Sequence, residues 1–180
     1  MNPERTLASR QVYSGHVVGL RLDTVELANG QTTLREIVEH GECVVIVPIN
    51  AAGNVLLVRQ YRKATDDFLL EAPAGGIDPG ESPDEAVQRE LAEETGFRAG
   101  RIRHLGGGYS SPGYCTEFLH LYLAEELTPA FAQPDADEDL TVVPMPLAAT
   151  IELIERGDIR DVKTIAALLL AQRLREKPQP

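Results

Sequence analysis

The 180-residue sequence contains no tryptophan and only two cysteines, Cys43 and Cys115. They lie far apart in the sequence, and we expect neither a disulfide nor a zinc site, but two small side chains in or near the core. Long apolar runs are also missing: the stretch 165–171 is far shorter than the roughly 18 residues of a membrane span. The start of the chain lacks the basic and apolar segments of a signal peptide, so we expect a cytoplasmic protein.

Basic residues are scarce, with 17 Lys and Arg against 28 Asp and Glu and a formal net charge of −11. Such a surface repels nucleic-acid polymers and anionic membranes, and we expect neither as a partner. A small anion remains possible, because a bound metal ion inverts the local field.

The first half of the sequence predicts strands. Residues 11–27 and 32–38 alternate between apolar and polar side chains, with Asn29-Gly30 between them, which predicts an antiparallel hairpin. Nearly unbroken apolar runs at 42–49 and 55–61 predict two strands that are buried on both faces.

A glycine-containing loop at 73–80 precedes several helix-start signals. Ser82 suits the N-cap, Pro83 the first helical position and Glu85 the partner in a capping box, and Gly96 is expected to end the helix. Further strands are expected at 102–109, 118–124 and 140–143, and helices at 146–156 and 161–175, the last burying Ala167, Leu170, Ala171 and Leu174. Strands first and helices later predict an α+β sandwich.

Three glutamates crowd one face of the helix predicted after Ser82. Glu90, Glu93 and Glu94 stand three and four residues apart, so their like charges repel and weaken the helix. A divalent cation with a preference for oxygen ligands turns this repulsion into attraction. Arg89 lies two helical turns from Glu81 and is expected to pair with it. A solvated acidic face is the alternative interpretation of the three glutamates alone.

The longer segment from Gly75 to Phe97 reads G-x5-E-x7-R-E-apolar-x-E-E-x-G-apolar. It resembles the Nudix box at every fixed position, with chance odds on the order of 10⁻⁸ per start position. The resemblance implies a Nudix fold, which is an α/β/α sandwich around a mixed β-sheet, here with an N-terminal antiparallel hairpin. It also implies hydrolysis of a pyrophosphate with Mg²⁺, for which Mn²⁺ is a possible substitute.

Segments outside the box resemble the ADP-ribose pyrophosphatase branch of the family. They are Gln60–Arg62, Glu71–Asp78, Ser110–Glu117 and Gly157–Thr164. Relatives that act on GDP-mannose and other nucleotide sugars share parts of these segments. ADP-ribose is therefore the first expected substrate, and another nucleoside diphosphate sugar is the alternative.

The resemblance also implies roles for individual residues. Metal ligands are expected to be Glu90, Glu94 and the backbone carbonyl of Ala74. Catalytic roles are expected for Glu93 and Arg89, and the general base is expected in the acidic loop 135–139, where Glu138 is the first candidate and Asp137 and Asp139 stay open. Substrate contacts are expected from Arg62, Gly76 and Glu117, whereas Tyr13, Arg35 and Arg59 remain undecided.

The resemblance further implies a homodimer in which the N-terminal segment, 1–40, is exchanged across a two-fold axis to complete the active site of the Nudix domain, 41–180. A lone hairpin is marginal in water, which agrees with such an exchange. Two other functions stay open: a non-catalytic module that binds a nucleotide sugar, and an enzyme that removes damaged nucleoside triphosphates.

Overall fold

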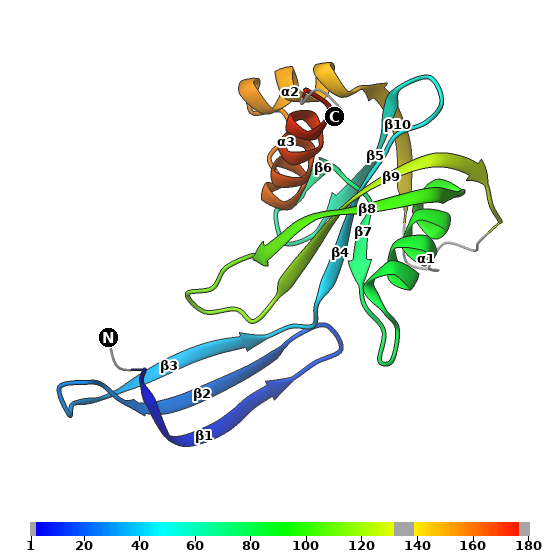
Figure 1. Cartoon of the computed structure of the whole chain (residues 1–180). Helices are drawn as coiled ribbons and strands as arrows, with labels where there is room; N and C mark the ends of the chain where they lie inside the picture. Colours follow the sequence, from blue (N-terminus) through cyan, green and yellow to red (C-terminus); the bar gives the residue numbers. More distant parts are fainter. Residues whose placement is uncertain (1–2, 132–138, 177–180) are drawn as a thin grey trace. The chain divides into compact units, whose positions relative to one another are not determined.

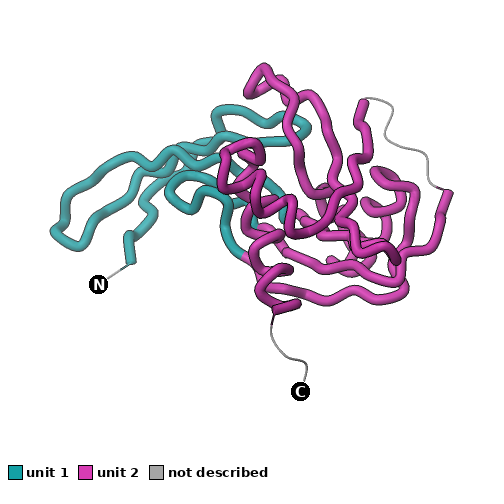
Figure 2. Tube along the Cα trace, turned by 90° about the horizontal axis from the view of Figure 1, so that it is seen from above, with its two compact units in different colours: residues 1–42, 108–118 teal, residues 43–107, 119–180 magenta. Residues whose placement is uncertain are grey.

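The computed structural model describes residues 3–131 and 139–176, so the candidate bases Glu138 and Asp137 lie outside the described residues. The chain divides into two compact units (Figure 2). Unit 1 comprises Met1–Glu42 and Gly108–Phe118, and unit 2 comprises Cys43–Gly107 and Leu119–Pro180. Both cysteines are partly buried.

Unit 1 contains a three-stranded antiparallel sheet in the order β1-β2-β3 (Figure 1). Its strands are β1 (Arg5–Ser14), β2 (Gly19–Glu26) and β3 (Thr32–Glu39). The hairpin between β2 and β3 turns at Asn29-Gly30 as predicted, with Gly30 at φ 80°.

The predicted strand 11–27 is wrong in one respect, because it breaks into two strands. The chain turns where the Gly15 amide donates to the carbonyl of Val18 at 2.9 Å, and β1 then extends back to Arg5. The N-terminal segment is therefore a three-stranded sheet rather than a hairpin. The turn was missed because the alternation of apolar and polar residues continues through it.

Unit 2 contains two sheets, in the orders β7-β4-β9-β8 and β10-β5-β6 (Figure 1). The strands are β4 (Cys43–Pro48), β5 (Asn54–Arg62), β6 (Asp67–Glu71), β7 (Ala74–Gly76), β8 (Phe97–Tyr109), β9 (Phe118–Pro129) and β10 (Leu140–Pro146). Strands β4 and β9 run parallel, whereas β4 and β7 run antiparallel, so the first sheet is mixed as predicted.

Strand β4 lies at the centre of the core because both of its faces are buried. Val44 and Ile46 pack against α1 (Pro83–Thr95) on one face. Val45 and Val47 face a second cluster that includes α3 (Val162–Glu176) and α2 (Leu147–Arg156). Each fully buried aliphatic side chain of this kind contributes about 1.5–3 kcal/mol. The result is the expected sandwich, with helices on both sides of the sheet (Figure 1).

Helix α1 begins and ends where the sequence predicts. The Ser82 hydroxyl accepts from the Glu85 amide at 3.3 Å, and the Glu85 carboxylate accepts from the Ser82 amide at 2.8 Å. Gly96 ends the helix in the left-handed conformation, at φ 74° and ψ 22°. This capping box fixes the register of the glutamates that follow.

The predicted buried face of α3 is partly wrong. Ala167 and Ala171 are buried, but Leu168 is buried with them and Leu170 is 38% exposed. The reason is that 165–171 is apolar all round, so the spacing of apolar residues does not single out one face. None of the described helices has the length and apolar character needed to cross a lipid bilayer.

Candidate functional site

The three box glutamates lie on α1 in graded environments. Glu94 is 3% exposed and Glu90 8% exposed, whereas the Glu93 side chain keeps 23% of its surface. A buried carboxylate is costly unless cations or hydrogen-bond donors surround it. The site therefore depends on the positive groups that the fold brings to this face.

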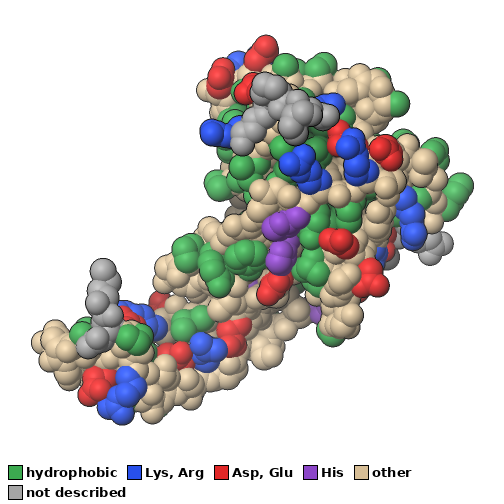
Figure 3. All heavy atoms as spheres, in the orientation of Figure 1, with side chains coloured by type: hydrophobic (Ala, Val, Ile, Leu, Met, Phe, Trp, Pro, Cys, Tyr) green, Lys and Arg blue, Asp and Glu red, His purple; other side chains and the backbone are tan. Residues whose placement is uncertain are grey.

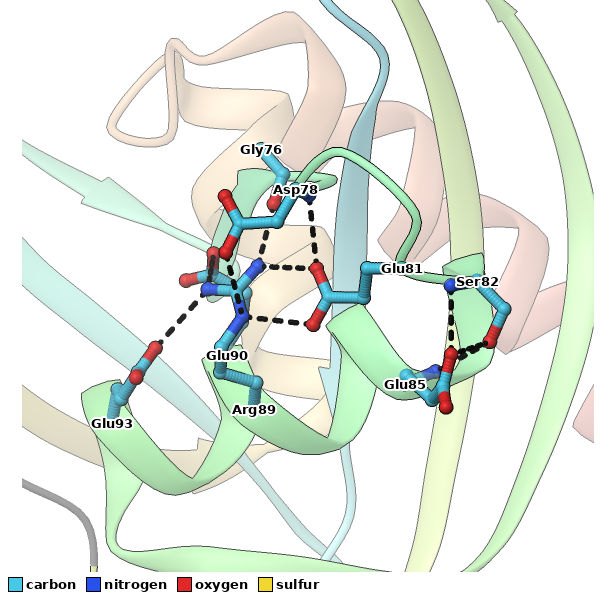
Figure 4. Close-up of polar contacts among 8 residues, drawn as sticks. All are labelled: Gly76, Asp78, Glu81, Ser82, Glu85, Arg89, Glu90 and Glu93. Carbon is cyan, nitrogen blue, oxygen red and sulfur yellow. Dashed lines mark hydrogen bonds and ion pairs between the residues drawn. The ribbon is translucent and has the colours of Figure 1, made fainter.

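Arg89 is the main positive group, and it connects the helix to the loop before it (Figure 4). Its Nε and Nη2 donate to the two oxygens of Glu81 at 2.9 and 2.8 Å, which is the predicted pair. Its Nη1 donates to Glu90 at 2.6 Å and to Glu93 at 3.2 Å, and Nη2 also donates to the Gly76 carbonyl at 2.7 Å. One guanidinium thus contacts three glutamates of the box, Glu81, Glu90 and Glu93, as well as the glycine loop.

The pairing of Arg89 and Glu81 changes the pKa of both groups. Hydrogen bonds to Glu81, together with those to Glu90, raise the pKa of Arg89. The hydrogen bonds from Arg89 lower the pKa of Glu81 below its ordinary value. Both groups therefore stay charged at neutral pH.

Side-chain hydrogen bonds anchor helix α1 to two strands of the sheet, β9 and β8. The Tyr122 hydroxyl on β9 donates to Asp84 at 2.9 Å, and burial is the main cause that raises the pKa of Tyr122 to about 12. The Gln88 side-chain amide exchanges two hydrogen bonds, of 2.9 and 3.1 Å, with the backbone of Ala99 on β8. A rigid helix holds its ligands more precisely than a loop would.

Gly75 lies directly against the Glu90 carboxylate. A Cβ built on Gly75 would stand 2.0 Å from Glu90 Oε1, so no side chain fits there without displacing that carboxylate. Strand β7 holds Gly75 in this place, because Val44 pairs with Gly75 and Val45 with Ala74. The sequence predicts a loop for this whole segment, 73–80, so strand β7 was not expected.

The donors gathered here fit a hard divalent cation. Glu90 and Glu94 are buried carboxylates on α1, and the more exposed Glu93 lies on the same helix, so all three side chains offer oxygen donors. Ala74 lies on β7, next to the glycine that makes room for Glu90. The carboxylate oxygens of Glu90 and Glu94 and the carbonyl oxygen of Ala74 are the predicted donors that would hold the ion.

Arg62, predicted to contact a diphosphate, lies at the end of β5 and pairs with Glu71. Its Nε and Nη2 donate to the two Glu71 oxygens at 2.9 and 2.8 Å. The hydrogen bonds that Arg62 donates to Glu71 raise the pKa of Arg62, and the charge of Glu94 contributes through space. The charge of Arg62 therefore interacts with that of a box glutamate, Glu94. Lys163 also reaches Glu71, at 2.6 Å, and the sequence reading gave neither Glu71 nor Lys163 a role.

Some of the predicted and undecided residues belong to unit 1. Glu117 belongs to unit 1, where its carboxylate lies 3.8 Å from Nδ1 of His40. Of the undecided residues, Arg35 pairs with Glu4 at 2.6 Å, and the Arg59 guanidinium lies 4.8 Å from the Phe68 ring centroid. Tyr13 is 58% exposed.

A cavity of about 570 Å³ lies along α1 and β8 in unit 2. It is lined by Asp84, Glu85, Gln88, Arg89, Ala92, Glu93, Arg98 and Ile102. It shares Arg89 and Glu93 with the box, but neither Arg62 nor Gly76 lines it. Most of these lining residues are charged or polar, and Ala92 and Ile102 are the apolar ones among them.

Known proteins resemble this chain over nearly its whole length. An ADP-ribose pyrophosphatase of Bacillus subtilis is 36% identical over 171 residues, which cover 94% of this chain and 92% of the relative. A GDP-mannose pyrophosphatase of Salmonella arizonae is 34% identical over 182 residues, covering 93% and 95%. The crystal structure of an ADP compounds hydrolase superposes with a TM-score of 0.88 at 30% identity, covering 97% of this chain and 95% of that chain.

Two family descriptions match adjacent parts of the sequence. The nucleoside diphosphate sugar hydrolase N-terminal domain matches residues 4–38, and the NUDIX domain matches residues 39–168. The second match contains the complete set of carboxylates around Arg89. The chain therefore belongs to the Nudix family and is a Nudix pyrophosphohydrolase.

Proposed function

We propose that the protein hydrolyses ADP-ribose to AMP and ribose 5-phosphate with the help of Mg²⁺, or of Mn²⁺ in its place. The observation that carries this proposal is that Arg89 holds Glu90 and Glu93 on the helix that also carries the buried Glu94, next to Gly76, where a Cβ would meet no neighbour within 4 Å. The ADP-ribose pyrophosphatase relative supports the choice of sugar nucleotide.

In the proposed reaction, water adds to one phosphorus and the bridging oxygen leaves with the other phosphate. A bound divalent cation would neutralise phosphate charge and acidify the attacking water. Arg89 holds Glu90 and Glu93 in place. The substrate can approach the backbone of Gly76, because a Cβ built there would meet no neighbour within 4 Å. Arg62 is proposed to grip the diphosphate. Glu138 stays a prediction as the base that takes the proton of water, with Asp137 and Asp139 as alternatives.

A substrate panel tests this function directly. Purified protein with Mg²⁺ is expected to convert ADP-ribose to AMP and ribose 5-phosphate, both identified by mass spectrometry. GDP-mannose belongs in the panel because a GDP-mannose pyrophosphatase is among the relatives, and dGTP tests the triphosphate alternative. A higher kcat/KM for GDP-mannose would replace ADP-ribose as the substrate. Tight binding of ADP-ribose without products would favour the non-catalytic module instead.

We further propose a homodimer that exchanges its N-terminal strands. Strand β1 is an edge strand whose ten residues are all exposed in the single chain, including the apolar Leu7, Val12 and Tyr13. Exposed edges with apolar side chains are sites for pairing with another chain. Sedimentation equilibrium is expected to give twice the mass of one chain, 2 × 19.7 kDa. A monomer with full activity would contradict the exchange.

The remaining partner prediction follows from charge. On the face drawn in Figure 3, Lys and Arg side chains are interspersed with Asp and Glu over unit 2. This pattern and the net charge of −11 agree with a small-molecule substrate rather than a nucleic-acid polymer. The cytoplasmic location stays a prediction.

A further inference from the structure

A buried carboxylate near the box is shared by two cations. Glu71 ends strand β6 and its side chain is 1% exposed. Arg62 donates to both of its oxygens, at 2.9 and 2.8 Å, and Lys163 Nζ lies 2.6 Å from Oε2. Burial raises the pKa of Glu71, but the contacts with Arg62 and Lys163 outweigh it and leave the pKa below the ordinary value, so the carboxylate is charged at neutral pH.

The first turn of α3 holds Lys163 in this position. Asp161 accepts from the Thr164 amide at 3.0 Å and lies 3.0 Å from Lys163 Nζ. The Thr164 hydroxyl in turn accepts from the Ala72 amide at 2.8 Å. Ala72 directly follows Glu71, so the same helical turn fixes both the lysine and the strand end that carries its partner.

The charges of this cluster balance. Two cations, Arg62 and Lys163, face two carboxylates, Glu71 and Asp161. Removal of Lys163 leaves the cluster with a net charge of −1, next to the box glutamates. Arg62 is then the one cation of the cluster that pairs with Glu71. An anionic diphosphate would then meet a net negative charge instead of a neutral cluster.

We infer that Lys163 is a positioning residue. By sharing Glu71 with Arg62, Lys163 keeps the Arg62 guanidinium in place and leaves the charge of Arg62 available for the diphosphate of the substrate. The inference rests on the proposed function, in which Arg62 grips the diphosphate. It assigns to Lys163 an effect on substrate binding rather than on the chemical step, because Lys163 acts through Glu71 and Arg62.

Replacing Lys163 with methionine is expected to raise KM for ADP-ribose about tenfold, with kcat changed less than about twofold. Lys163→Arg restores the charge and is expected to return KM to within about twofold of the original value. The matched control is Arg160→Met, which removes a cation three residues earlier that pairs with Asp67 of β6 at 2.6 Å. Arg160→Met is expected to leave KM unchanged.

Binding is measured separately from turnover, by calorimetry with α,β-methylene ADP-ribose, whose bridging carbon resists hydrolysis. A tenfold weaker affinity of Lys163→Met for this analogue supports the inference, and an unchanged affinity overturns it even if the protein consumes no ADP-ribose. Loss of kcat at constant KM would also overturn it. If Lys163→Met does not fold, Lys163→Gln carries the same expectation, since it keeps a hydrogen-bond donor without the charge. Failure of the proposed function itself shows in the unchanged protein, which would then form no AMP.

Discussion

Glu94→Gln is expected to lower kcat for ADP-ribose by about a thousandfold while the protein stays folded. Glu94 is 3% exposed and lies on the same face of α1 as Glu90. The amide has the shape of the carboxylate but lacks its charge, so it weakens the hold on a divalent cation. A loss of about 4 kcal/mol of transition-state stabilisation, which corresponds to that factor, is in the range that a metal ion supplies.

Thermal unfolding with and without Mg²⁺ separates this effect from a loss of structure. Without the ion, Glu94→Gln is expected to unfold at or above the temperature of the original protein, because one of the crowded charges is gone. Added Mg²⁺ is expected to raise the melting temperature of the original protein but not of the variant. Glu152→Gln, at an exposed position on α2, serves as the control and should change neither property. Full activity of Glu94→Gln would remove Glu94 from the metal site.

Arg89→Met is expected to lower the free energy of unfolding by about 3 kcal/mol and kcat/KM by about a hundredfold. The guanidinium makes hydrogen bonds to Glu81, Glu90, Glu93 and the Gly76 carbonyl, and its removal leaves mutually repelling carboxylates, one of them 8% exposed. Urea unfolding of the metal-free protein measures the loss. Mg²⁺ is expected to recover part of it, because the ion replaces some of the missing positive charge.

Two further variants show whether geometry or charge is responsible. Arg89→Lys keeps the charge but cannot donate in parallel to both oxygens of Glu81, so an intermediate stability is expected. Arg101→Met breaks a surface pair with Glu125, and the Arg101 side chain is 59% exposed, so its cost should stay below about 1 kcal/mol. If Arg89→Met cost no more than Arg101→Met, the network around Arg89 would not hold the site together.

The box helix could be predicted from the sequence because its signals are local. The capping residues Ser82 and Glu85, the stop at Gly96 and the pair formed by Arg89 and Glu81 all depend on spacing within two or three turns. Local hydrogen bonds of this kind leave clear patterns in a sequence. The buried strands β4 and β5 were also predicted, because continuous apolar runs identify strands that are covered on both faces.

Features that depend on distant pairing were missed. Strand β7 is only three residues long and forms because β4 is beside it, which the glycine-rich sequence does not indicate. The contact of Glu71 with Lys163 joins positions 92 residues apart, and nothing local to either residue predicts it. The buried face of α3 was misjudged at Leu170 because tertiary packing, rather than periodicity, selects the face of an apolar helix.

The absence of space beside Gly75 limits how this enzyme can diversify. A methyl group at that position would occupy the volume of the Glu90 carboxylate, so a library randomised at position 75 should return glycine alone among active clones. Gly76 has open space around it, and the same selection should accept small side chains there. Changes in substrate preference are therefore expected to arise in segments away from this glycine, which tolerate variation without moving a metal ligand.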